Sequence, residues 1–360
     1  MQQAIPCSIM RGGTSKGLYF LAKDLPIDTA LRNQLLLHLM GSPDERQIDG
    51  LGGAHPLTSK VAIVSSSDRD DADVEFLFLQ VVVNKAQVSD AQNCGNILAG
   101  VGPFAIEQGL ILAKNDFTDV RIHMLNTGAN AVARVQTPNT QVSYVGDAVI
   151  DGVPGSSAPV TIDFLDIAGS SCGSLFPSGN SQDLIQGIAV SCVDNGMPVV
   201  LLKASDFGLT GAESPTDLEA KQDLKEKLEA IRLKAGLLMN LGDVSQKTVP
   251  KMTLISKPLR GGLLNTRSFI PHRVHEAIGV LGSVSVATAC VLKGTVAHDL
   301  LQQDFADGNI EIVVEHPSGQ FNVNMEVSGS ADIKSFKIHR AALLRTARLL
   351  MRGEAMAANY

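Results

Sequence analysis

The sequence of 360 residues lacks tryptophan altogether, and aromatic residues make up only 4% of it. Platforms for stacking on bases or sugars are therefore scarce, which argues against a nucleic-acid or glycan-binding surface. Charged residues amount to 19%, and the net charge of −7 is spread without a long run of one sign, so a surface for polyanions or anionic membranes is not indicated. The longest weakly polar stretch, residues 277–292, falls short of the roughly 20 residues of a membrane span. The expected partner is a small molecule.

The five cysteines are odd in number and widely spaced, and no CxxC pair occurs. Neither a disulfide framework nor a zinc ribbon is indicated, and a reducing compartment fits these thiols best. The N-terminal residues also lack a basic start followed by an apolar core. We therefore expect a cytoplasmic protein without nucleic-acid or membrane partners.

Several enzyme motifs are absent as well. No GxSxG elbow supports a serine hydrolase, and no GxGxxG follows a first strand to bind a dinucleotide. Residues 11–17 lack the GxxxxGK[ST] order of a nucleotide loop, and HExxH is missing. The chemistry that remains is proton transfer on a small anion, for which no cofactor and no metal are expected.

The sequence contains a similar series of predicted elements in each half, and the chain is long enough for two domains. Short β-rich runs separated by Gly, Asn and Asp fill both halves, at 60–65, 73–83, 119–124 and 131–136, then at 188–193, 198–203, 252–256 and 311–315. Pro, Gly, Ser and Asn cluster at 176–185. This cluster predicts two similar halves, residues 1–183 and 184–360.

Helical periodicity appears in five places. It predicts a helix over 29–40 with Asp28 as its cap, and amphipathic outer helices over 216–239 and 336–352, of which the last can pack back on the first half. Residues 94–108 and 275–293 are apolar on all sides, so these two helices must be buried. We expect an α+β fold in which each half wraps a sheet around one buried helix.

The two buried helices can be aligned on the glycines that follow them. Gly109 and Gly294 each suit a left-handed helix end. Cys94 lies 15 residues before Gly109, and the same count back from Gly294 reaches Gly279. The second half therefore carries no cysteine at the equivalent place.

The most informative short motif is Asn93-Cys94-Gly95-Asn96, because it places a cysteine at the first turn of a buried helix. Free N–H groups and the helix dipole stabilise a thiolate there, and the neighbouring amides can bind a carboxylate or an enolate oxygen. A small buried cysteine beside an Asn turn is the alternative.

A second motif, residues 52–60, is a glycine turn that leads into a strand through Ser59 and Lys60. A lysine at this place can point into a cleft and act in proton transfer, although most lysines at strand starts sit in water.

Two further segments suit an anion. Residues 11–17 bring amides, hydroxyls and cations, including Thr14, Ser15 and Lys16, although a surface hairpin turn would look the same. Residues 265–275 place Arg267, His272 and His275 before the second buried helix, where cations and free helix amides can bind carboxylates. A solvated basic turn is the alternative, and a metal site lacks a third ligand at a suitable spacing.

Long strings of the sequence resemble the 2-methylaconitate isomerase family, which has the diaminopimelate epimerase-like fold. The strings cover nearly the whole chain: MRGGTSKG (10–17), IDGLGGAHPLTSKVAIV (48–64), QNCGNILAGVGPFAIE (92–107), IDGVPG (150–155), CVDNGMPVV (192–200), NLGDVSQKTVPKM (240–252), NTRSFIPHRVHEAIGV (265–280) and EHPSG (315–319). The resemblance implies two α/β halves that face each other across one active site.

The resemblance also implies an activity. It suggests a cofactor-independent isomerase that moves a proton in a small unsaturated tricarboxylate or dicarboxylate, with 4-oxalomesaconate of gallate catabolism as the expected substrate. The alternatives are 2-methylaconitate and a tricarboxylate-binding protein without catalysis. A homodimer is a possible assembly.

By position, the family's lysine and cysteine fall on Lys60 and Cys94, which are the expected acid–base pair in either order. The expected substrate-binding residues are those of the matching strings: Thr14, Ser15, Lys16, Ser59, Asn93, Gly95, Asn96, Met197, Arg267, His272 and His275. Racemising relatives use two opposed cysteines, so Gly279 argues against racemase activity. Several relatives also carry a cysteine where this chain has Val274.

Overall fold

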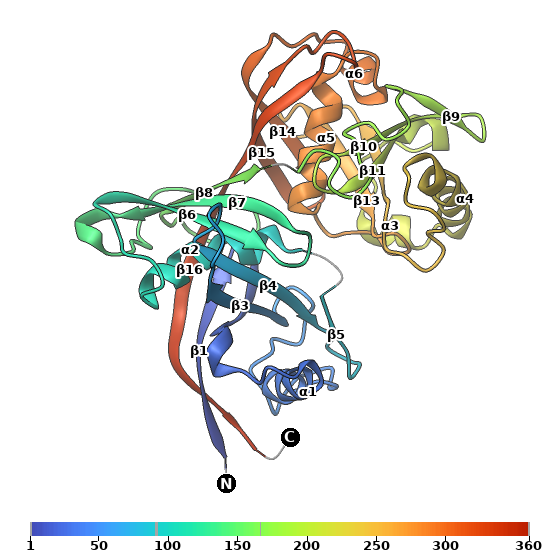
Figure 1. The fold of residues 1–360 in the computed structure, drawn as a ribbon. Coiled ribbons are helices and arrows are strands. Elements are labelled where there is room, and N and C mark those ends of the chain that lie inside the picture. The colour runs from blue at the N-terminus through green and yellow to red at the C-terminus, as the bar shows by residue number, and fades with distance from the viewer. Residues whose placement is uncertain (1, 91–92, 166, 359–360) are drawn as a thin grey trace. The chain divides into compact units, whose positions relative to one another are not determined.

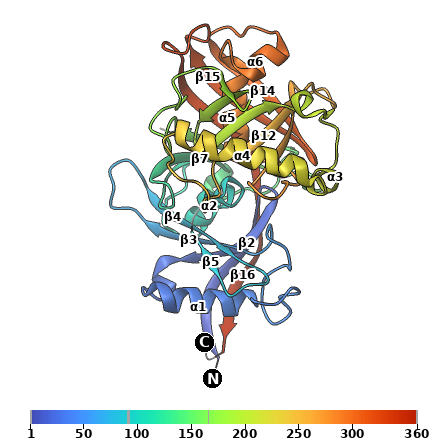
Figure 2. The same cartoon turned by 90° about the vertical axis from the view of Figure 1, so that its right-hand side faces the viewer.

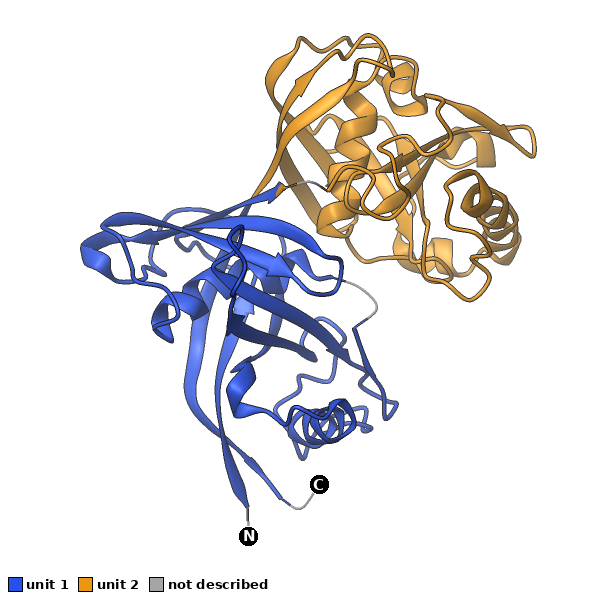
Figure 3. Cartoon of the chain, viewed as in Figure 1, with its two compact units in different colours: residues 1–164, 344–360 blue, residues 165–343 orange. Residues whose placement is uncertain are grey.

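The computed structural model describes residues 2–90, 93–165 and 167–358, and the chain forms two compact units (Figure 3). Unit 1 comprises residues 1–164 and 344–360, and unit 2 comprises residues 165–343. The change of unit thus falls before the expected boundary at residue 183, and residues 344–360 return to unit 1. The segment 165–183 belongs to unit 2 because it is tied to a strand there: Asp194 Oδ2 accepts the N–H groups of Ser171 and Cys172.

Unit 1 encloses a helix in a ring of strands (Figure 1). Its strands follow the order β1-β2-β3-β4-β6-β7-β8-β16, and β16 also pairs with β1, which closes the ring. The strands are β1 (Gln3–Gly12), β2 (Ser15–Leu21), β3 (Lys60–Ser66), β4 (Val74–Val81), β6 (Asp116–Met124), β7 (Ala129–Thr137), β8 (Pro159–Leu165) and β16 (Lys337–Ala357), with the short β5 (Val88–Ser89) beside β4.

The helix inside this ring is α2 (Gly95–Glu107), and its residues Ile97 to Ala105 are all buried. Outside the ring, α1 (Thr29–Met40) covers the other face of β2 and β3 with its buried leucines, and Asp28 caps it. Short 3-10 turns η1 (Ala22–Asp24) and η2 (Pro138–Thr140) complete the unit. The expected helices over 29–40 and 94–108 are thereby confirmed.

Unit 2 repeats the arrangement. Its strands are β9 (Asp183–Ile185), β10 (Ile188–Asp194), β11 (Pro198–Lys203), β12 (Lys251–Ser256), β13 (Leu264–Phe269), β14 (Gly308–His316) and β15 (Gly319–Ser328), which pairs with the first part of β16. The central helix α5 (Val280–Val291) is buried along its whole length, and α6 (Val296–Leu301) follows it. On the opposite face lie the 3-10 turn η3 (Ala204–Phe207), α3 (Pro215–Glu219) and α4 (Gln222–Leu238), as Figure 2 shows for α4.

The pattern of strand pairing is the same in both units. Along β1-β2-β3-β4-β6-β7 the pairs are antiparallel, parallel, antiparallel, parallel and antiparallel. The pairs along β10-β11-β12-β13-β14-β15 follow the same sequence. Each outer helix lies between the second and third strands of its series, and each central helix precedes the fifth. The internal duplication predicted from the sequence is confirmed.

Equivalent positions of the central helices follow from this match. Cys94 is the N-cap residue of α2, and Gly279 is the N-cap residue of α5. Gly109 and Gly294 beyond their C-terminal ends have positive φ angles of 72° and 85°. The alignment of Cys94 with Gly279 by counting is therefore confirmed.

The expected helix over 336–352 is wrong, because these residues belong to the 21-residue strand β16. Ala, Leu and Arg are good helix formers, but residues 341–347 are nearly all buried and pair with strands of both units. Burial on both faces therefore overrides helix propensity. The second apolar helix also starts later than expected, at Val280. Among the described helices, none has both the length and the apolar character that a membrane crossing requires.

Close packing on α2 gives a stability prediction. An added Cβ at Gly100 would lie 2.5 Å from Tyr19 Oη, whereas the same atom at Gly282 of α5 would meet only Ile278 Cγ1, at 3.6 Å. We expect Gly100→Ala to lower the free energy of unfolding by about 1–3 kcal/mol through overpacking. Gly282→Ala should be neutral or slightly stabilising, since alanine favours helix by about 0.5–1 kcal/mol. Urea denaturation of both variants checks this, and equal losses would contradict it.

Candidate functional site

Cys94 occupies the positive end of the buried helix α2. Its side chain makes no capping hydrogen bond, and the thiol is partly exposed. The N–H of Cys94 donates to Asn93 Oδ1 at 3.2 Å, while the N–H groups of the first helical turn have no partners within the helix. The thiol and these amides therefore share the electropositive end of the helix dipole.

The hairpin between β1 and β2 packs directly on this helix end. A Cβ at Gly12 would collide with the carbonyl oxygen of Asn96, and one at Gly13 would collide with Asn96 Oδ1. Asn96 Nδ2 donates to Thr14 Oγ1 at 3.1 Å. Asn96 Oδ1 and the buried Ser15 Oγ have no hydrogen-bond partner among the described residues. Thr14, Ser15 and Asn96 thus lie together at the entry of α2.

Lys60 is the first residue of β3 and only 6% exposed. Its Nζ donates to Gln80 Oε1 at 2.7 Å and lies 4.9 Å from the ring centre of Phe78. A flip of the Gln80 side-chain amide would break a second hydrogen bond, because its Nε2 donates to the carbonyl of Ser59 at 2.8 Å. Gln80 therefore offers Lys60 a fixed acceptor.

Strand register places Lys60 at the same end of unit 1 as Cys94. Lys60 pairs with Gly17, two residues after Ser15, and the hairpin before Ser15 contacts Asn96. Val61 packs on the α1 face of the sheet, so Lys60 faces the α2 side. Both residues of the expected acid–base pair thus lie on the inner face, at the end of the ring where α2 begins.

Tyr19 contacts the first turn of α2. Its hydroxyl donates to the carbonyl of Ile97 at 2.6 Å, and the ring is fully buried. Burial raises the pKa of Tyr19 well above its usual value, and the nearby Cys94 adds to the effect. A neutral phenol at this depth fixes the first turn of α2.

Two expected binding residues of unit 1 point elsewhere. Lys16 lies next to Ser15 in the strand and so faces the opposite side, with Nζ 3.4 Å from the place of a Cβ at Gly53. Ser59 is fully buried, and its hydroxyl donates to the carbonyl of Val81 and accepts from Gln47 Nε2. These contacts fit a supporting role behind Lys60. Asn93 and Gly95 flank Cys94 directly.

In unit 2, the expected residues differ in their surroundings. The guanidinium of Arg267 donates to the carbonyls of Glu213 and Thr266 and to Asn265 Oδ1. These hydrogen bonds connect β13 to the loop before α3, which is a structural role. His272 is exposed, with Nδ1 at 3.8 Å from a Glu229 oxygen.

The other two unit 2 residues lie in chain segments near α5. The carbonyl of Met197 accepts from Ser285 of that helix, and His275 Nδ1 accepts the N–H of Ala277.

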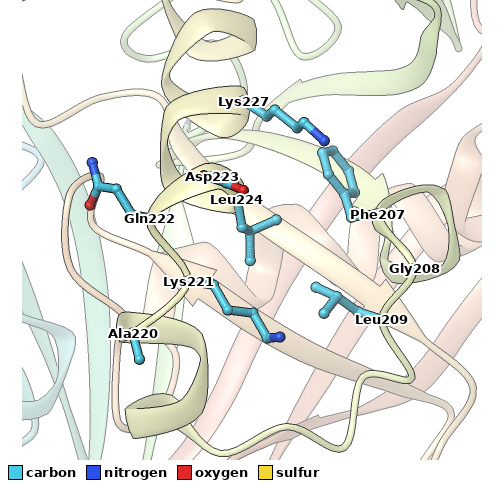
Figure 4. Close-up of a pocket in the computed structure, with 9 residues that line it drawn as sticks. All are labelled: Phe207, Gly208, Leu209, Ala220, Lys221, Gln222, Asp223, Leu224 and Lys227. Carbon is cyan, nitrogen blue, oxygen red and sulfur yellow. The ribbon is translucent and has the colours of Figure 1, made fainter.

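A pocket of about 490 Å³ lies in unit 2 at the start of α4 (Figure 4). Phe207 and Leu224 line it together with Lys221 and Lys227. It contains none of the residues expected from the sequence.

Sequence reasoning missed Gln80, Phe78 and Tyr19. Gln80 interrupts the apolar run FLFLQVVV at 76–83, and a single polar side chain in a buried strand needs a partner. That signal points to Gln80. Tyr19 and Phe78 look like ordinary core residues in the sequence.

Thiol chemistry separates Cys94 from the other cysteines. Burial raises the pKa of Cys192 and of Cys290 to about 12, and it also raises the pKa of Cys7 and Cys172. We expect iodoacetamide at pH 8 to alkylate the folded protein at Cys94 and to leave the four buried thiols unmodified. Peptide mapping by mass spectrometry checks this, with Cys94→Ser as the control. Equal labelling of a buried thiol would contradict it.

Comparisons with known proteins agree on one family. The family model described as "PrpF protein" matches residues 2–358. A 4-oxalomesaconate tautomerase from Pseudomonas putida is 58% identical over 98% of this chain and 96% of its own length. A (4E)-oxalomesaconate Delta-isomerase from a Novosphingobium species is also 58% identical, over 97% and 96%. At 33% identity, a 2-methyl-aconitate isomerase from Shewanella oneidensis is more distant.

Comparison with solved structures identifies the fold. The structure of a methylitaconate-delta-isomerase superposes with a TM-score of 0.85 at 36% identity, covering 99% of this chain and 96% of that one. A hydroxyproline epimerase from Agrobacterium vitis shares only the fold, with a TM-score of 0.58 at 13% identity. The diaminopimelate epimerase-like fold expected from the sequence is thus confirmed, and the chain belongs to the PrpF protein family.

Proposed function

We propose that the protein is an isomerase that moves a proton within 4-oxalomesaconate, a small unsaturated tricarboxylate, with Lys60 and Cys94 as the acid–base pair. The observation that carries the proposal is the 58% identity, over nearly the whole chain, to a protein named 4-oxalomesaconate tautomerase. The position of Lys60 and Cys94 at one end of unit 1 supports it. The second relative at 58%, named for an isomerase of the same compound, adds to this support.

The chemistry needs one base, one acid and a place for negative charge. One member of the pair removes a proton from the carbon next to a carbonyl, which leaves a dienolate. The other returns a proton two carbons away or on oxygen. The N–H groups of Gly95, Asn96 and Ile97 can stabilise the dienolate, whereas that of Cys94 already donates to Asn93. The reaction as written requires no cofactor.

The glycine at the start of α5 bears on the type of reaction. Inversion of a stereocentre needs an acid and a base on opposite faces, and Gly279 stands where a second cysteine would be required. A Cβ at Gly279 would meet nothing within 4 Å, so packing does not demand a glycine there. This supports a proton shift over a racemisation.

We infer a cytoplasmic location, which the free thiols support. All five cysteines are free in the structure. A reducing compartment would keep Cys94 available as a thiol.

The test is proton NMR of 4-oxalomesaconate in deuterated buffer, with and without the enzyme. We expect rapid enzyme-dependent interconversion of the tautomers and deuterium entry at the carbon acid. The labelled position identifies the carbon that receives the proton. If no exchange above the buffer rate is seen, 4-oxalomesaconate is excluded as the substrate. In that case 2-methylaconitate would be tested in the same way.

Two substitutions test the acid–base pair. Lys60→Met should lower kcat by at least about 10³-fold, because the ammonium is replaced by a group that cannot carry a proton. Cys94→Ser should lower kcat by about 10²- to 10³-fold, because an alcohol has a far higher pKa than a thiol. Steady-state kinetics, with circular dichroism as the folding control, measures both effects. Near-normal turnover of either variant would remove that residue from the mechanism.

A further inference from the structure

Lys60 is a buried cation that is held by neutral groups. Its side chain is 6% exposed, and among the described residues no carboxylate forms an ion pair with it. Buried charges are normally paired with an opposite charge, because the loss of hydration is costly. The position of this ammonium therefore depends on the polar and aromatic side chains around it in unit 1.

Two side chains of β4 contact the ammonium. Gln80 lies directly opposite Lys60 in the antiparallel pair of β3 and β4, and its Oε1 accepts from Lys60 Nζ at 2.7 Å. Phe78 lies opposite Ala62, and its ring centre is 4.9 Å from the same nitrogen. The amide oxygen and the face of the aromatic ring both attract an ammonium. Of the two, Gln80 alone makes a directional contact.

Gln80 is itself held in one orientation. Its Nε2 donates to the carbonyls of Ser59 at 2.8 Å and of Pro56 at 3.1 Å. Because a carbonyl oxygen can only accept, these contacts keep Nε2 turned toward residues 56–59 and leave Oε1 for Lys60. The hydroxyl of Ser59 donates to the carbonyl of Val81 on the neighbouring strand, so Ser59 is fixed as well. The acceptor that faces Lys60 therefore has a defined place.

The absence of charge on this acceptor matters for proton transfer. A group that exchanges a proton with a substrate has to exist in both its charged and its neutral form during one turnover. A carboxylate at position 80 would form an ion pair with the ammonium and would oppose the neutral amine. The amide of Gln80 fixes the place of the amine and adds no charge.

We propose that Gln80 is the positioning residue of Lys60, an amide that fixes the amine for proton transfer and leaves its charge free to change. This proposal rests on the proposed function, and it extends the site by one residue of β4. Gln80 acts through Lys60 and does not itself exchange a proton with the substrate.

Matched substitutions provide the first test. Gln80→Met keeps the length of the side chain and removes the acceptor, so it should lower kcat by about 10²-fold through misplacement of the amine. KM should change by less than about threefold, because the lost contact is not one with the substrate. Gln136→Met is the control and should leave both constants unchanged, since Gln136 is half-buried like Gln80 and lies on β7, opposite Phe117.

The pH profile of Gln80→Glu separates positioning from packing. The carboxylate still accepts from Lys60, so at its own pH optimum this variant should be more active than Gln80→Met. Its negative charge favours the ammonium form, so one limb of the kcat profile should move to higher pH by about one unit or more. This is the acid limb if Lys60 is the base, and the alkaline limb if Lys60 is the acid. An unmoved profile would overturn the proposal.

A third measurement does not depend on turnover. In protein labelled with ¹³C at lysine Cε, the Lys60 signal is identified by its loss in Lys60→Arg. Because Nζ lies 4.9 Å from the ring centre of Phe78, the adjacent methylene protons of a fixed side chain should have shifts unlike those of exposed lysines. We expect Gln80→Met to move these shifts toward the values of exposed lysines, and Gln136→Met to leave them in place.

The outcomes separate the two proposals. Turnover of 4-oxalomesaconate by the wild type, with a lowered kcat and a moved Lys60 signal in Gln80→Met, supports both. Turnover with an unchanged kcat in Gln80→Met, or with an unmoved signal, overturns the role of Gln80 alone. A moved signal without turnover by the wild type supports the positioning of Lys60 and overturns the proposed substrate. Neither turnover nor a moved signal overturns both.

Discussion

The constraint on which the structure depends is the burial of two helices that have no polar face. Residues Ile97 to Ala105 of α2 and all residues of α5 are buried. A helix that is apolar on every side can be stable only if it is enclosed. In unit 1 the strands close into a ring around α2, and glycines at 100 and 102 let the neighbouring side chains approach. Enclosure leaves the N-terminal end of the helix as the place for chemistry, because the N–H groups of its first turn have no partners within the helix.

Duplication then provided two such helix ends, and the two have diverged. Unit 1 has a cysteine at the helix entry and a lysine whose ammonium is held by Gln80. Unit 2 has Gly279 and Lys251 at the matching places. The same backbone therefore carries a thiol and a hydrogen-bonded lysine in one unit, and in the other a glycine and a lysine that has no partner among the described residues. The difference lies in a few side chains, while strand order and register are retained.

Much of this arrangement could be predicted from the sequence. Periodicity identified α1 and α2, and counting from Gly109 and Gly294 aligned Cys94 with Gly279 correctly. The single helix expected over 216–239 is divided into α3 and α4 in the structure. The strand β16 was missed because its local preference is helical and only pairing with distant strands decides its structure. The contact of Gln80 with Lys60 was also out of reach, since it follows from cross-strand register. A sequence does not state which residue lies opposite which.

The long strand β16 has a consequence for how the chain is completed. Its last residues pair with β1, so Gln3 lies opposite Ala357 and the two ends of the chain form one seam of the ring in unit 1. During synthesis every strand of unit 2 leaves the ribosome before this seam can close. Unit 2 is thus able to form while α2 still lacks part of its cover. The apolar helix of unit 1 then remains partly unshielded until residues 344–357 of β16 arrive, and exposed apolar surface of this kind favours aggregation.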